Sequence, residues 1–225
     1  MRTYVEEKPY GNPIGLGSSL ASKSTSGLSG EHVSRLVDCY WHFNPGTTEL
    51  NQHLVIPDNR IDFIHDDRGW HLCGPMTRPF YGSDREIFGL RINPSYFYSI
   101  LQIPLSEFKD LNVELSSIDS LTFSDIFHRR EYSSFKTFVD TMSTQLAQKE
   151  IKRYRLIEAA LEQLHCGISV RKVSFHLGLS DQHLRRLFKK HLGISPKKYQ
   201  KVEQFIKVKK LIESKKMNVS SALAD

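Results

Sequence analysis

The sequence contains little cysteine and no long apolar run. Its 225 residues include only Cys39, Cys73 and Cys166, and no CxxC pair. So sparse a set favours a reducing compartment over a disulfide framework. No stretch of 18 uncharged apolar residues occurs, so we expect no membrane-spanning helix. The first ten residues, MRTYVEEKPY, lack the apolar core of a secretory signal.

Positive charge is concentrated at one end of the chain. Residues 151–225 carry 17 Lys or Arg and 6 Asp or Glu, whereas residues 1–150 carry 14 basic and 19 acidic side chains, which together give the formal net charge of +6. A weakly acidic part joined to a strongly basic part indicates two domains. The basic part is expected to face a polyanion, although a solvated Lys-rich helix would have the same composition.

The local patterns divide the chain into three segments. Residues 1–30 are predicted to be a flexible arm, because 11–30 are rich in Gly and Ser and lack periodicity. Residues 31–150 open with short β-branched and aromatic runs such as HLVIP, IDFI and EIFGLRI, separated by turns such as PDN and DDRG. They predict an antiparallel sheet, in a barrel or half-barrel, followed by helices. Residues 151–225 are predicted to be all helical, so the fold class is α+β.

Three helices are expected after the strands. The first begins at Pro94, the second spans about 117–128, and the third spans about 133–149. The third has apolar residues at i, i+3, i+4, i+7 and i+11 from Phe135. This stripe can pack on the sheet or on the same helix of a second subunit, and the sheet is the preferred interpretation.

The basic segment predicts a helix-turn-helix. A helix over 151–166 ends at Gly167, and Ser169 caps a helix over 170–177. A turn containing Gly178 leads to Ser180, which caps the helix DQHLRRLFKKHL. In this geometry the second helix can enter a major groove. A solvent-facing polar helix of an ordinary bundle is the alternative.

The outer face of that second helix carries the candidate DNA contacts. Arg can bond guanine O6 and N7, and Gln can bond adenine N6 and N7, whereas Lys suits phosphates. The predicted DNA-binding residues are Ser180, Gln182, His183, Arg185, Arg186, Lys189, Lys190 and Lys198.

The stretch SVRKVSFHLGLSDQHLRRLFKKHLGISPKKYQ, residues 169–200, resembles the DNA-binding domain of AraC/XylS-family bacterial transcription regulators. The resemblance extends over about 155–225 and implies two helix-turn-helix units joined by a long helix, here 196–215. Base contacts are then implied for Gln182, Arg185 and Arg186. NVSSALAD, residues 218–225, is where the second unit would open. Its glycine turn and recognition helix are missing, so we expect a C-terminally truncated DNA-binding domain.

The segments VIPDNRIDFIHD (55–66), GPMTRPF (74–80), GLRINPSYFYSIL (89–101) and IPLSEFKDLNVEL (103–115) resemble a cupin-like N-terminal domain found in such regulators. This resemblance implies a small β-barrel or half-barrel that binds a small effector, with helices that pair two subunits. Arg78 and Arg91 lie in these segments and are the effector-binding candidates, since an inward Arg can hold an anion in a bidentate contact. The alternative is that each Arg pairs with Asp58 or Asp62 to organise a turn.

No metal site is predicted. Four histidines, at positions 42, 53, 65 and 71, fall in the β region, but no His-x-His pair accompanies them. Without a metal, Asp62 and Asp66 on one strand face are the remaining carboxylate pair, and a solvated face explains them more simply. We therefore expect no catalytic residues, no cofactor and no enzymatic activity.

The sequence thus predicts a cytoplasmic, nucleoid-associated transcription regulator that binds double-stranded DNA. Its further expected partners are a small-molecule effector, a second copy of the chain and RNA polymerase, with no membrane. Two alternatives stay open. One is a truncated regulator that acts only as a sensor or dimerisation module, and the other is a cupin-type enzyme.

Overall fold

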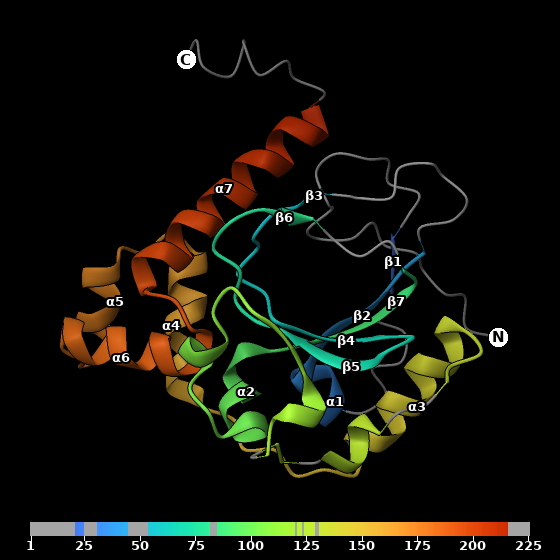
Figure 1. Cartoon of the computed structure of the whole chain (residues 1–225). Helices are drawn as coiled ribbons and strands as arrows, with labels where there is room; N and C mark the ends of the chain where they lie inside the picture. Colours follow the sequence, from blue (N-terminus) through green and yellow to red (C-terminus); the bar gives the residue numbers. More distant parts are fainter. Residues whose placement is uncertain are drawn as a thin grey trace.

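The computed structural model describes residues 21–24, 31–44, 54–81, 85–119, 121–122, 124–128 and 131–215 (Figure 1). An antiparallel sheet with helices over one face comes first, and a unit made only of helices follows it. The α+β class expected from the sequence is therefore confirmed. None of the helices in the described ranges has the length and apolarity that a membrane span requires.

The larger sheet has six strands in the order β1-β2-β7-β4-β5-β8, and every neighbouring pair is antiparallel. These strands are β1 (Ala21–Ser24), β2 (Val37–Phe43), β4 (Asp62–Asp66), β5 (Gly69–Cys73), β7 (Ile87–Ile92) and β8 (Asn112–Glu114). A second, two-stranded sheet pairs β3 (Leu54–Val55) with β6 (Phe80–Tyr81). The larger sheet is open, so it does not form the closed barrel that was one of the two predicted forms.

Helices α1 (Glu31–Leu36), α2 (Pro94–Leu101) and α3 (Phe135–Ala147) cover one face of this sheet (Figure 1). Side chains alternate along a strand, so one face of β7 faces the helices with Phe88, Leu90 and Ile92, which are buried in the core. Gly89 and Arg91 belong to the opposite face. At the start of α2, Asn93 accepts a hydrogen bond from the Ser95 backbone N–H, and Pro94 takes the first helical position as predicted.

The apolar stripe of α3 packs on the sheet. Phe138, Val139, Met142 and Leu146 are all buried in the core, and the Phe138 ring meets Tyr40 of β2 edge to face at 6.0 Å. A hydrogen bond of 2.9 Å from Ser143 Oγ to the Tyr40 hydroxyl adds a polar contact. The preferred interpretation of the stripe is confirmed, and because the stripe is buried within the subunit it cannot also carry a dimer contact.

Two predicted segments differ from the structure. The helix expected over 117–128 is replaced by the short 3₁₀ turns η2 (Leu115–Ser117) and η3 (Ser124–Phe127). Leu115 reaches the core from η2, whereas Ile126 and Phe127 reach it from η3. Within the predicted arm, Ala21–Ser24 forms the edge strand β1, which pairs with β2. The rest of that arm, residues 1–20 and 25–30, lies outside the described residues.

The helical unit consists of α4 (Arg155–His165), α5 (Val170–His176), α6 (Asp181–Leu192) and α7 (Pro196–Lys215). It has its own hydrophobic core, separate from that of the sheet. In Figure 1 it lies at the side of the sheet, where α6 contacts α2 and the 3₁₀ turn η1 (Leu105–Phe108). The two domains predicted from the charge distribution are therefore in direct contact.

Candidate nucleic-acid interface

Helices α5 and α6 form the predicted helix-turn-helix. Ser169 Oγ accepts a hydrogen bond from the Lys172 backbone N–H at the start of α5, and Ser180 Oγ accepts one of 3.1 Å from the His183 N–H at the start of α6. Between the helices, Gly178 adopts φ 64°, a conformation that favours glycine. The sequence signals for this motif are confirmed, except that α5 ends one residue earlier, at His176.

The two helices are held at a fixed angle by a small core and one polar contact. Val173 of α5 packs with Leu184 and Phe188 of α6, and all three are completely buried. Ser174 is also buried, and its hydroxyl donates to Asp181 Oδ1 at the first turn of α6. This bond joins the helices where they cross, so the outer face of α6 has a defined orientation.

That outer face borders an open groove of about 780 Å³. Gln182, Arg185, Arg186 and Lys189 of α6 line it and are exposed. In the part of the chain that the structure describes, no hydrogen bond or ion pair engages these four side chains. They are therefore available to a ligand, and guanidinium, amide and ammonium groups together suit base edges and phosphates.

The groove also contains residues that the sequence reasoning did not assign to the site. They are Ser169, Val170 and Arg171 at the start of α5, Asp181 of α6, and Ser195, Pro196, Lys197 and Gln200 at the start of α7. Positive charge was the only sequence signal for Arg171 and Lys197, and charge does not say which face a residue joins. The beginning of the 20-residue helix α7 adds a helix N-terminus, which favours anions.

Two of the predicted phosphate contacts lie against the N-terminal domain, and their contact with DNA stays a prediction. The ammonium of Lys190 lies over the ring of Tyr98 of α2, 3.7 Å from its centroid. Lys198 Nζ lies 3.5 Å from the Thr77 carbonyl oxygen, at the limit of a hydrogen bond. Ser180 and His183 stay exposed beside the groove residues at the start of α6.

The C-terminal end of α6 is packed closely on the N-terminal domain. His191 is 1% exposed, and its ring lies 5.6 Å from that of Tyr98 and 4.5 Å from that of Tyr154. The segment before α4 is tied to α2, because the Tyr154 N–H donates to the Ser95 carbonyl at 3.0 Å. Burial, together with a smaller effect of the nearby charge of Lys190, lowers the pKa of His191 to about 4.

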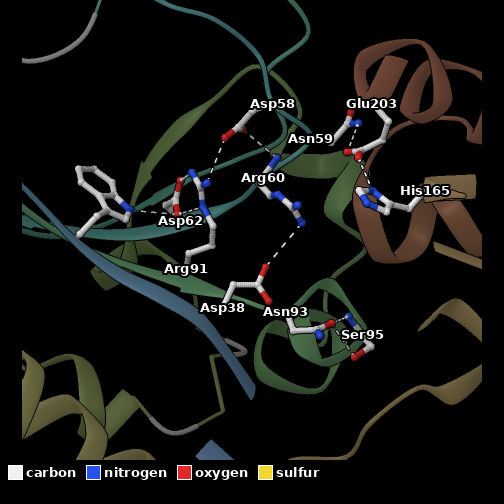
Figure 2. A network of polar contacts seen from close by, with 11 residues as sticks. Asp38, Asp58, Asn59, Arg60, Asp62, Arg91, Asn93, Ser95, His165 and Glu203 are labelled. Atoms are coloured by element: carbon white, nitrogen blue, oxygen red, sulfur yellow. Dashed lines mark hydrogen bonds and ion pairs between the residues drawn. The ribbon is translucent and has the colours of Figure 1, made fainter. Parts of the chain in front are cut away.

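A second contact joins the domains at the PDN turn before β4 (Figure 2). Asn59 adopts φ 60°, and its Nδ2 donates to the Tyr199 carbonyl at 2.8 Å and to Glu203 Oε1 at 3.2 Å. Glu203 is itself buried, and its other oxygen lies 2.9 Å from His165 Nδ1 of α4. One turn of the N-terminal domain therefore holds both α7 and, through Glu203, α4.

Arg91 fixes the position of that turn. Its Nε and Nη2 donate to the two carboxylate oxygens of Asp62 at 2.8 Å each, and its Nη1 lies 3.1 Å from Asp58 Oδ2 (Figure 2). Trp41 Nε1 also donates to Asp62, at 3.2 Å. Burial raises the pKa of Asp58, while the charge of Arg91 opposes that shift. This is the ion-pair alternative weighed for Arg91, in which the guanidinium organises a turn.

The other candidates of the N-terminal domain are not gathered into a site. Arg78 is exposed in the bend before β6. The pKa of Asp110 is lowered against the effect of burial mainly by hydrogen bonds from Thr77, and the charge of Arg78 adds only a little. No group of three His, Cys, Asp or Glu within the described ranges lies close enough to hold a metal ion. Effector binding by Arg78 and Arg91 stays a prediction.

The exposed face of α6 and the crossing of α5 and α6 define a helix-turn-helix DNA-binding protein. Residues 161–201 match the family model of bacterial regulatory helix-turn-helix proteins of the AraC family, and residues 29–114 match a domain of unknown function, DUF6597. The chain thus carries an AraC-type DNA-binding domain, which confirms the resemblance and makes it a DNA-binding transcription regulator. No curated protein and no solved structure matches the chain. The segment 218–225, where a second unit is expected to open, lies outside the described residues.

The depressed pKa of His191 predicts a specific pH dependence of stability. Between about pH 4 and pH 6.5 the unfolded chain holds a proton on His191 that the folded chain does not. The free energy of unfolding should therefore rise with pH across this window, by up to about 1.4 kcal/mol per pH unit from this residue. Urea unfolding of the wild type and of His191→Phe, at several pH values, measures the difference in slope. Parallel profiles for the two proteins would contradict the assignment.

Removal of the Arg91 side chain should strongly destabilise the fold. Arg91→Met leaves Asp58 and Asp62 without their shared cation in a partly buried position, a loss of up to roughly 3–5 kcal/mol. Arg85→Met is the matched control, because the Arg85–Asp67 pair is exposed and should contribute at most about 1 kcal/mol. Both are measured as changes in the urea midpoint. Equal, small losses would show that Arg91 does not organise the turn.

Proposed function

We propose that this chain regulates transcription by reading DNA sequence with α6 in the major groove. The observation that carries the proposal is the exposed set Gln182, Arg185, Arg186 and Lys189 on one side of a helix whose opposite side is core. A helix with its side chains is about 10–12 Å across, which matches a major groove of about 12 Å. A helix that packs in the core and also reads a DNA groove needs one apolar side and one exposed polar side, and α6 has both.

The residues divide into base-reading and phosphate-binding groups. Arg185 and Arg186 suit guanine O6 and N7, and Gln182 suits adenine N6 and N7. Lys189, Ser180 and His183 suit phosphates flanking the α6 contacts. On the other wall of the groove, Arg171 and Lys197 are placed to meet the backbone, with the N-terminus of α7 beside Lys197.

The N-terminal domain is proposed to control this DNA binding. Support comes from its contacts with α6 and α7, through His191 and Asn59 respectively. Binding to chromosomal DNA would place the protein in the cytoplasm of a bacterium. A small effector, a second subunit and RNA polymerase are the further partners in this proposal.

The first experiment is fluorescence anisotropy with this chain and a mixed-sequence duplex at several salt concentrations. A steep fall of log affinity with log salt is expected, because each phosphate contact releases counterions. Selection from a random duplex library then defines the operator. No binding even at low salt would contradict the proposal for this chain and favour the alternative of a sensor or assembly module.

Two substitutions on α6 should separate base reading from phosphate binding. Arg186→Ala should relax preference at one base step, at a cost of roughly 1–3 kcal/mol on the selected operator. Lys189→Ala should weaken all sequences alike and reduce the salt slope by about one unit. Anisotropy titrations on operator and scrambled duplexes measure both. If Arg186→Ala loses equal affinity on the two duplexes, Arg186 does not read a base.

A further inference from the structure

The recognition helix α6 presents two successive lysines to different surroundings. Lys189 is exposed and lines the groove, whereas Lys190 is half-buried with its ammonium against the ring of Tyr98. Neighbouring positions on a helix differ by about 100° in direction, so a long side chain at 190 can reach the backbone beside a DNA groove once it is released. In the docked form, the Lys190 ammonium contacts the ring of Tyr98 instead.

The position of Lys190 is a consequence of domain docking. The Tyr98 ring lies in a cluster with the rings of Tyr154, at 5.9 Å, and His191, at 5.6 Å. These three rings meet only because α6 lies against α2. Just beyond, a Cβ added at Gly193 would lie 2.5 Å from Pro75 Cγ and 2.6 Å from the Leu105 carbonyl oxygen, so the approach is as close as the backbone permits. While this packing persists, the Tyr98 ring competes with a phosphate for the Lys190 ammonium.

The start of α7 has a weaker version of the same arrangement. Lys198 Nζ is directed to the Thr77 carbonyl oxygen, and Thr77 is held in place by Asp110, whose Oδ2 accepts from the Thr77 hydroxyl at 2.8 Å. Lys197, one residue earlier, lines the groove. In both helices, therefore, one lysine lines the groove and the next one contacts the N-terminal domain.

We propose that the N-terminal domain restrains DNA binding by withholding Lys190, and to a smaller extent Lys198, from the phosphate backbone. This rests on the proposed function, since it describes regulation of the same DNA-binding surface. Release of α6 from α2 and η1 adds phosphate contacts without changing the base-reading residues. The docked and released forms therefore differ in affinity and salt dependence, and not in the sequence they prefer.

The size of the effect follows from counterion release. One added phosphate contact steepens the slope of log affinity against log salt by about 0.9. Over a fourfold range of salt this corresponds to an additional change in affinity of about 3.5-fold. Two added contacts would steepen the slope by about 1.8.

The direct test removes the ring that holds Lys190. Tyr98→Ala should bind mixed-sequence duplex more tightly at low salt than the wild type, with a slope steeper by about 0.9 to 1.8 units. Tyr98→Phe is the control, because it keeps the aromatic face and should keep the wild-type slope. The double variant Tyr98→Ala, Lys190→Ala should lose about one unit of the gain, which assigns it to Lys190.

A second variant releases the domains by a different contact. Gly193→Ala places a methyl group against the Leu105 carbonyl in a residue with φ 71°. Gly167→Ala imposes a similar backbone strain at φ 84° with nothing within 4 Å, so it controls for the strain alone. Hydrogen exchange of the Tyr154 amide, which donates to the Ser95 carbonyl, reports undocking without DNA and should be faster in Gly193→Ala only.

The outcomes separate this inference from the proposed function. Wild type that fails to bind DNA at any salt would contradict the function itself. Suppose that the wild type binds DNA, and that Tyr98→Ala shows faster exchange of the Tyr154 amide but an unchanged salt slope. This result would contradict the restraint, because undocking would then add no phosphate contact. A steeper slope in Tyr98→Ala that survives Lys190→Ala would also overturn the assignment to Lys190. Should Gly193→Ala fail to fold, the Tyr98 series still decides the question.

Discussion

The relation between the two domains depends on how closely the end of α6 packs on η1. Gly193 has no side chain, and its positive φ ends α6 where the backbone of Leu105 lies against it. That approach buries the His191 ring between Tyr98 and Tyr154 and keeps it neutral at physiological pH. A larger residue at 193 would separate the surfaces, and the aromatic and polar contacts around them would be lost together.

A single helix therefore has three functions in this protein. Leu184 and Phe188 form the core of the helix-turn-helix, and Arg185 and Arg186 face solvent one residue away. The last turn of the same helix is an interdomain contact. Because a helix is rigid over 12 residues, its docked end and its groove-lining residues move as one body.

The N-terminal contribution to this arrangement is electrostatic as well as apolar. Arg91 holds the carboxylates of Asp58 and Asp62, and the turn between them presents Asn59 to α7 (Figure 2). Such a partly buried network is satisfied only when all its partners are in place. The turn is consequently well defined, and it connects the face of the sheet opposite the helices to the helical unit.

Much of the helix-turn-helix was predictable because its signals are local. Ser169 and Ser180 cap their helices, Gly178 makes the turn, and Phe188 lies at a helical interval from Leu184. The helix predicted over 117–128 does not form. Ile118 and Ile126 are buried from separate short turns, so their spacing resembles a helical pattern although no helix is present. Local propensity is overridden when tertiary contacts supply the burial.

The sequence by itself determined the α+β class and the helix-turn-helix, because periodicity, caps and charge act over a few residues. Only the tertiary structure decided that Lys190 contacts Tyr98, that Arg91 pairs with two aspartates, and that Asn59 holds α7. These contacts join residues up to 144 positions apart. No local pattern specifies such partners, because they meet only after both domains have folded and packed together.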